Sequence, residues 1–227
     1  MNYEYYRDFQ EYLNIGKNIA GIHCHKSIEM IYVLKNNIKI TINDRIHFLK
    51  ENELAVIPPY APHSLDFDNA AITQVNTFPS QYSEQYIQTI GDTHPVSQIV
   101  YDKEIAKDIA AHLRMIIKNP SAMMKTGIYN YCLAQFLDNV EKRVVPKNSK
   151  ESQIDLFYKV LLFIDDNYNE EITLEDLAKK FGYSKFYFSS LFNDNLHTNL
   201  KNYINNVRIG KSVELLRTHS VTETAFL

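Results

Sequence analysis

Three histidines and one glutamate in the first third of the chain have the residue types and spacing of a binding site. His23 and His25 are two residues apart, so on an extended chain both side chains point to the same face. Glu29 lies on the strand expected next, and His63 follows a proline-rich turn. Imidazole and carboxylate groups are ligands of divalent cations. The same four groups can also line a pocket for an organic ligand or satisfy one another, and we expect a pocket without metal.

Short strands are predicted around these residues. Apolar and polar residues alternate in Ile38–Ile42, and turn-forming pairs such as Asn36-Asn37 and Asn43-Asp44 separate one apolar run from the next. The expected strands are Ile28–Leu34, Ile38–Ile42, Arg45–Leu49, Leu54–Ile57, Ser64–Phe67 and Ala71–Phe78. This pattern is typical of a small β-sandwich or β-barrel.

The order of the polar residues resembles the two motifs of the cupin fold, a His-x-His with a Glu four residues later and then a His after a proline-containing turn. The resemblance implies a β-barrel that binds a ligand through His25, Glu29 and His63. In metal-dependent cupins these three positions and that of His23 hold a divalent ion. Two departures are Asn36, where the family usually has Gly, and Pro59-Tyr60-Ala61-Pro62, which replaces a Pro-x-Gly. No cofactor is expected, a divalent metal is possible, and no catalytic residue is assigned.

Helices are predicted after Gly91. Asp102 is the expected N-cap of a helix with one apolar face that ends at Asn119-Pro120, and Met123–Val145 is expected to be a second helix. The second helix carries apolar residues on more than one face, so it either contributes to a homodimer, with Phe136 as the first residue to test, or only covers the β-sheet. Pro146–Lys150 is polar and is predicted to be a linker, followed by a helix over Ile154–Tyr168.

Residues 172–216 are predicted to form a helix-turn-helix followed by a long helix. Thr173 and Asp176 have the spacing of a capping box, and Gly182 ends the first helix because the turn requires a positive φ. Ser184 is the expected cap of the second helix, whose buried stripe is Phe188, Leu191 and Phe192. Two short helices joined by a glycine-containing turn present the second helix to the DNA major groove.

This segment closely resembles the AraC family of transcription regulators. The resemblance is carried by Ile172–Ala178, Phe181–Ser184, Tyr187–Ser189 and Leu191-Phe192, with Tyr203–Leu216 similar to the helix that links two such units and His219–Ala225 similar to the start of the second unit. Ser190 and Asn193-Asp194 stand where basic residues are common, and the sequence stops before a second recognition helix. We therefore expect weak operator binding from this 227-residue chain.

Four residues of the predicted recognition helix are candidates for DNA contact. Lys185 is expected to meet a phosphate, Phe186 to touch a thymine methyl group, and Ser189 and Ser190 to face the base edges. The whole chain has a net charge of −3, but residues 177–227 contain seven basic and three acidic residues. This end of the chain is therefore the one expected to face phosphates.

The expected fold class is α+β, with a cupin-like ligand-binding domain at 1–95, a helical linker and dimerisation region at 96–150, and a helical DNA-binding region at 151–227.

The absence of a long apolar run predicts a cytoplasmic protein with no membrane segment. Two distant cysteines indicate free thiols in a reducing compartment. The sequence thus predicts a non-enzymatic, ligand-responsive regulator whose partners are DNA, a small-molecule effector and a second copy of itself. A metal-dependent cupin enzyme with an accessory helical domain is the alternative, and a dimerising protein that binds DNA poorly is a third.

Overall fold

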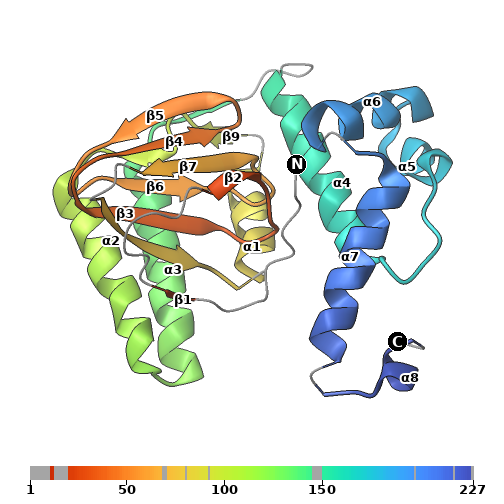
Figure 1. Cartoon of the computed structure of the whole chain (residues 1–227). Helices are drawn as coiled ribbons and strands as arrows, with labels where there is room; N and C mark the ends of the chain where they lie inside the picture. The colour runs from red at the N-terminus through yellow and green to blue at the C-terminus, as the bar shows by residue number, and fades with distance from the viewer. Residues whose placement is uncertain are drawn as a thin grey trace. The chain divides into compact units, whose positions relative to one another are not determined.

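The computed structural model describes residues 11–12, 20–67, 71–79, 81–91, 93–144, 150–196, 198–216 and 218–225. The chain divides into two compact units, residues 8–146 and residues 147–227. The N-terminal unit is a β-structure covered by helices and the C-terminal unit is all helical (Figure 1). The α+β fold class predicted from the sequence is therefore confirmed.

The strands of the N-terminal unit form two main sheets. One sheet has the order β1-β8-β3-β6-β10 and the other the order β2-β7-β4-β5. The first contains β1 (Glu11–Tyr12), β3 (Glu29–Lys35), β6 (Leu54–Ile57), β8 (Ile72–Thr77) and β10 (Ile99–Val100). The second contains β2 (Ala20–His23), β4 (Ile38–Ile42), β5 (Arg45–Leu49) and β7 (His63–Phe67). All described hydrogen-bonded neighbours within these sheets are antiparallel, and most of them, such as β3 with β8 and β2 with β7, are far apart in sequence.

Asparagine supplies the backbone conformation that two of the tight turns need. Asn43 and Asp44 have φ values of 49° and 63° between β4 and β5, and positive φ at both central residues matches the right-handed twist of the strands. Asn36, which stands at the expected glycine position of the cupin motif, has a φ of 62°. Asn tolerates the left-handed region better than other residues with a side chain, so the turn forms without Gly.

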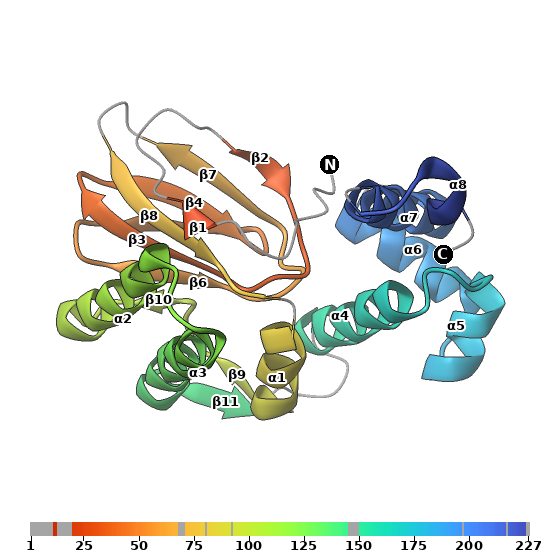
Figure 2. The same cartoon turned by 90° about the horizontal axis from the view of Figure 1, so that it is seen from below.

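Three helices cover the sheet that contains β3 (Figure 2). They are α1 (Gln81–Ile90), α2 (Lys103–Met115), which continues as a 3-10 turn at Ile116–Lys118, and α3 (Ala122–Asn139). Met30 and Tyr32 of β3 belong to the same apolar core as Ile109 and Phe136 of the helices. Since side chains alternate along a strand, Glu29 and Ile31 face the opposite side of the sheet. Asp102 accepts hydrogen bonds from the amides of Glu104 and Ile105 as the predicted N-cap of α2.

The second long helix of this unit is shorter than the sequence pattern predicts. α3 ends at Asn139, and β11 (Lys142–Val144) then pairs with β9 (Thr93–Pro95). The helix ends because Val140 is extended and the next residues find a strand partner, a long-range pairing that local periodicity cannot indicate. Phe136 is 1% exposed and packs in the unit's own core, so it is not available at a dimer surface.

The C-terminal unit contains five helices, within the described residues. They are α4 (Lys150–Asp166), α5 (Leu174–Phe181), α6 (Lys185–Leu196), α7 (Leu200–Leu215) and α8 (Val221–Thr224). Its core is rich in aromatic side chains, with ring pairs Phe157–Phe192 and Phe192–Tyr203 whose centroids lie 5.5 and 5.6 Å apart. The predicted linker residues 146–149 lie outside the described residues. Within the described chain, no helix combines the length and the apolar character that crossing a bilayer requires.

Candidate functional site

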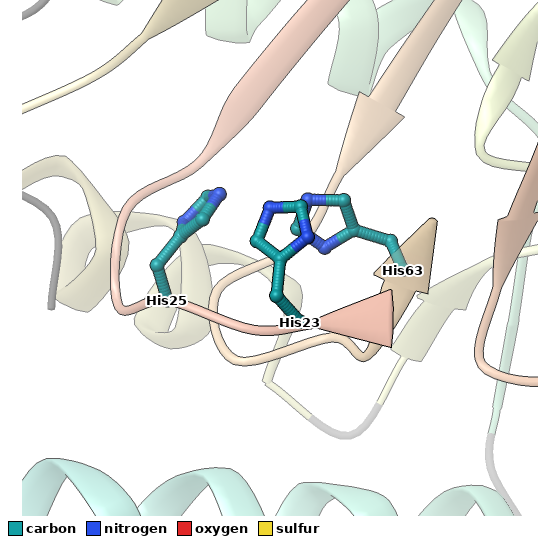
Figure 3. Close-up of side chains that lie close together, drawn as sticks. All are labelled: His23, His25 and His63. Carbon is teal, nitrogen blue, oxygen red and sulfur yellow. The ribbon is translucent and has the colours of Figure 1, made fainter. Parts of the chain in front are cut away.

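The structure brings together the three histidines and the glutamate that the sequence singled out. His23 ends β2, His25 lies in the β2–β3 connection, Glu29 opens β3 and His63 opens β7. His23 and His63 are opposite each other in the β2–β7 pairing, and the ring centroids of His23 and His63 are 4.2 Å apart (Figure 3). The ring centroids of His25 and His63 are 5.0 Å apart. The ligating atoms of the three histidines all lie within 4.8 Å of one another.

Glu29 reaches this histidine cluster from the other sheet. Its Oε2 atom lies 3.3 Å from Nε2 of His25, and its Oε1 atom lies 4.0 Å from Nε2 of His63. His25, Glu29 and His63 are at most 3% exposed, and His23 is 8% exposed. The four side chains therefore form a buried polar site. Its first and last members in the sequence, His23 and His63, are 40 positions apart.

Backbone carbonyls fix the orientation of two of the imidazoles. Nδ1 of His25 donates to the carbonyl oxygen of Ser27 at 2.9 Å, and Nδ1 of His63 donates to that of Ala61 at 2.8 Å. In a neutral imidazole the second nitrogen then carries the lone pair. Nε2 of His63 is buried and has no hydrogen-bond partner among the described residues. It therefore offers an electron pair to a ligand in the cluster.

Burial governs the charges of the site. Burial lowers the pKa of His63 to about 3, helped by the neighbouring His25 and His23 and opposed by Glu29, so this imidazole is neutral at pH 7. Burial alone raises the pKa of Glu29, but the adjacent His25 and the other two histidines outweigh it, and the net pKa lies below the usual value. A neutral imidazole next to an ionised carboxylate is the donor set that a divalent cation requires.

The proline-rich turn positions His63 without the expected glycine. Tyr60 has a φ of 58° and is fully buried, and its amide donates to the carbonyl oxygen of His25 at 2.7 Å. This bond ties the turn before β7 to the segment that carries His25. The strained tyrosine conformation is held by burial and hydrogen bonding, which compensate for the missing Gly.

The second candidate site is the helix-turn-helix formed by α5 and α6. Thr173 and Asp176 form the predicted capping box, and Gly182 ends α5 with a φ of 77°. The side chain of Ser184 accepts from the amide of Tyr187 at 3.2 Å, as an N-cap of α6 does. Phe188 and Phe192 are fully buried. The local pattern of the sequence therefore predicted this motif correctly.

All four candidate DNA-contacting residues are exposed on α6. Lys185, Phe186, Ser189 and Ser190 are accessible, and Phe186 is 75% exposed. The ammonium group of Lys185 bonds Oε1 of Glu175 on α5 at 2.9 Å. This hydrogen bond is the largest cause of the lowered pKa of Glu175. Sequence reasoning missed Glu175, because the pairing depends on how α5 and α6 pack.

Comparison with known proteins supports the prediction of a helix-turn-helix regulator. The chain is 26% identical over 195 residues to YdiP of Escherichia coli, an uncharacterized HTH-type transcriptional regulator, covering 82% of the chain and 64% of YdiP. It resembles helix-turn-helix transcription regulators. A 58-residue segment is 40% identical to the TetD protein of transposon Tn10 from Escherichia coli, covering 26% of the chain and 42% of TetD. The chain thus spans less than two thirds of either relative, and no protein-family description matches it.

The fold agrees with that of a solved structure over nearly the whole chain. Apo ToxT from Vibrio cholerae superposes with a TM-score of 0.54 at 9% sequence identity, covering 98% of this chain and 89% of that one. At this identity the likeness establishes the fold alone. The shared arrangement is a β-domain followed by a helical domain that contains the helix-turn-helix.

Proposed function

We propose that the chain is a ligand-responsive DNA-binding transcription regulator of the AraC type. The observation that supports this most strongly is the complete helix-turn-helix, in which α6 exposes Lys185, Phe186, Ser189 and Ser190. The similarity to an HTH-type regulator over 82% of the chain points in the same direction. In this proposal the protein acts in the cytoplasm, where its DNA target lies.

The four exposed residues of α6 divide between phosphate and base contacts. Lys185 contacts a phosphate, because phosphate oxygens take most of the hydrogen bonds that proteins make to DNA and Lys is among their main donors. Phe186 contacts a thymine methyl group, and Ser189 and Ser190 hydrogen-bond base edges. In the absence of DNA the ammonium group of Lys185 pairs with the carboxylate of Glu175. When DNA binds, this exposed ion pair is replaced by a contact between Lys185 and a phosphate.

The effector is bound between the two sheets of the N-terminal unit, at His25, Glu29 and His63. These side chains are buried, and Nε2 of His63 has no hydrogen-bond partner among the described residues. A ligand that bonds to this lone pair would stabilise one arrangement of the domain over another. Regulation then follows from a shift in populations, because a ligand changes an equilibrium by its differential affinity for the two states.

A divalent cation is the second candidate for the ligand, with His23, His25, His63 and Glu29 as its ligands. The fit is supported by two imidazoles whose Nδ1 atoms donate to backbone carbonyls, which is the usual way of aiming Nε2 at a metal. When bound, such an ion would act as a Lewis acid. The same cluster would serve a metal-dependent cupin enzyme, the alternative that the similarity to regulators disfavours.

DNA binding is tested first by selecting bound sequences from a random library with the purified chain. Binding of the selected duplex is then measured by fluorescence anisotropy over a salt series. We expect sequence-dependent binding that weakens steeply with salt and that a Ser189→Asp, Ser190→Asp variant loses. Recovery of no preferred sequence, or equal binding by the variant, would contradict the proposal.

The ligand is tested separately by thermal denaturation and elemental analysis. Proteins that bind a ligand only when folded melt at a higher temperature in its presence. Stabilisation by Mn²⁺, Zn²⁺ or Fe²⁺ that is lost in a His25→Ala, His63→Ala variant would assign the metal, whereas stabilisation by an organic compound alone would assign a metal-free pocket. Organic acids, sugars and fatty acids form the first screen.

A further inference from the structure

Strand β5 is the edge strand of its sheet in the part of the chain that the structure describes. Within the described residues it is hydrogen-bonded to β4 alone, over the five pairs from Ile38–Leu49 to Ile42–Arg45, with no bulge (Figure 1). Proteins usually protect such an edge with a proline, a bulge or a very short strand, because its free backbone groups pair with any other strand. β5 has none of these three features.

The exposed apolar side chains of this sheet lie on the edge strand itself. Ile46 is 57% exposed and Phe48 is 71% exposed. The residues opposite them on β4, on the same face, are Thr41 and Lys39. The next strand inward, β7, continues this face with Ser64 and Asp66. The apolar surface is therefore one strand wide, which suits a partner that adds at the edge rather than one that covers the face.

The outer face of β5 is self-complementary when read in opposite directions. Its outward side chains are Ile46 and Phe48, and the strand is flanked by Asp44 in the turn before it and by Lys50 after it. An antiparallel second copy centred on His47 places Ile46 opposite Phe48 of the other copy, and it brings the end of the strand next to Asp44 towards the end next to Lys50 of the other copy. Apolar and opposite-charge pairs directly across two strands are stabilising, and like charges there are destabilising.

On the inner face of the strand, the same pairing places His47 opposite its own copy and Arg45 opposite Leu49 of the other copy. His47 lies on the two-fold axis, so the two His47 side chains face each other. Its Nε2 atom is buried and has no hydrogen-bond partner among the described residues. Burial and then Arg45 lower the pKa of His47, which favours the uncharged imidazole, so the pairing does not bring two like charges together at this position.

We propose that two copies of this chain associate through antiparallel pairing of their β5 strands, centred on His47, to form one continuous eight-stranded sheet. The sheet joins the four strands β2-β7-β4-β5 of each copy. The symmetric contact is of the isologous type that closes a two-fold dimer. A single strand pair is a small interface, of the size found in weak and transient associations.

Analytical ultracentrifugation of the full 227-residue chain, without DNA, tests the interface from about 1 to 200 μM, a range in which a weak association is detected. The dimer should weaken by about tenfold or more in Phe48→Glu and Ile46→Lys variants, whose positions are already exposed and whose melting temperatures should not change. A Met123→Glu variant on the 87% exposed position of α3 is the matched control and should dimerise normally. A monomeric wild-type chain at the highest concentration, or a dimer sensitive to Met123→Glu and not to Phe48→Glu, would overturn the proposal.

Charge reversal tests the register. Asp44→Lys and Lys50→Asp should each weaken the homodimer, because each brings like charges towards each other. The variant that carries both substitutions should regain the homodimer. A mixture of the two single variants should form a heterodimer, because the two positive ends of β5 in one variant then face the two negative ends in the other. Dimerisation that is unchanged in both single variants would refute the register centred on His47. The measurement contains no DNA or effector, so its result is independent of the regulatory function proposed above.

Discussion

His23 and His63 face each other across β2 and β7, with their ring centroids 4.2 Å apart, while Nδ1 of His63 is held by the carbonyl oxygen of Ala61. The second sheet contributes Glu29, whose Oε1 atom is 4.0 Å from Nε2 of His63. The contact between the histidines and Glu29 therefore depends on the packing of two sheets. Any change that separates the sheets disperses the site, and a ligand held at the site resists that separation.

Acid should destabilise the N-terminal unit because of His63. Its pKa is about 3 in the folded chain, against an ordinary value of 6.5, so between these values the unfolded chain binds a proton that the folded chain does not. Stability is therefore fully present above about pH 6.5 and is lost as the pH falls towards 3, by at most about 1.4 kcal/mol per pH unit. The lowered pKa of Glu29 acts in the same direction at lower pH.

Scanning calorimetry at about pH 7, 6 and 5 measures this effect and separates the transitions of the two units. A His63→Gln variant keeps a polar side chain but cannot titrate, so its melting temperature should depend less on pH over this range. Equal pH dependence in the two proteins would show that another group is responsible.

The sequence predicted the elements better than it predicted their assembly. Alternation and asparagine turns gave β4, β5 and β6 with the bounds that the structure has, because both signals are local. The end of α3 at Asn139 and the pairing of β11 with β9 were not predictable, since a distant strand decides them. In the site, the His-x-His spacing indicated a shared face, but the opposition of His23 and His63 required the β2–β7 register.

A core substitution on α3 should destabilise the N-terminal unit rather than change its oligomeric state. Phe136 is 1% exposed among side chains of the sheet and of α2. Phe136→Ala should cost about 3–5 kcal/mol of unfolding free energy, as deletion of a buried aromatic ring does. Met123→Ala, on the same helix but at an 87% exposed position, should change it by less than about 0.5 kcal/mol. Urea denaturation followed by circular dichroism distinguishes the two, and similar costs would mean that α3 does not pack as described.

The turn of the helix-turn-helix should not tolerate a side chain at Gly182. Its φ of 77° is in the left-handed region, although no atom beyond the adjacent residues lies within 4 Å of the position that a Cβ would take, so the cost of Gly182→Ala is conformational and not steric crowding. We expect a loss of about 1 kcal/mol in the C-terminal unit. Gly182→Asn should cost less, because Asn tolerates this region, and calorimetry of the three proteins would give the order. An alanine variant as stable as wild type would contradict the turn conformation.

Replacement of Lys185 should weaken DNA binding without affecting the fold. Its ammonium group pairs with Glu175, both side chains are at least half exposed, and such pairs contribute little to stability. The Lys185→Ala variant should therefore have the melting temperature of the wild type. It should bind DNA more weakly whatever the sequence of the duplex, and the slope of log K against log salt should fall by about 1. Glu175→Gln is the matched control, because it breaks the same ion pair and leaves the lysine available for a phosphate. It should bind DNA as tightly as wild type or more tightly.

Replacement of Phe186 should change the sequence preference of DNA binding rather than its salt dependence. Phe186→Ala removes an apolar contact with a thymine methyl group and no charge, so it should relax the preference at one thymine position and leave the salt slope unchanged. Anisotropy titrations of this variant and of Lys185→Ala over the same salt series separate the two roles. An equal loss of slope in Lys185→Ala and Phe186→Ala would show that α6 does not lie in the groove as proposed.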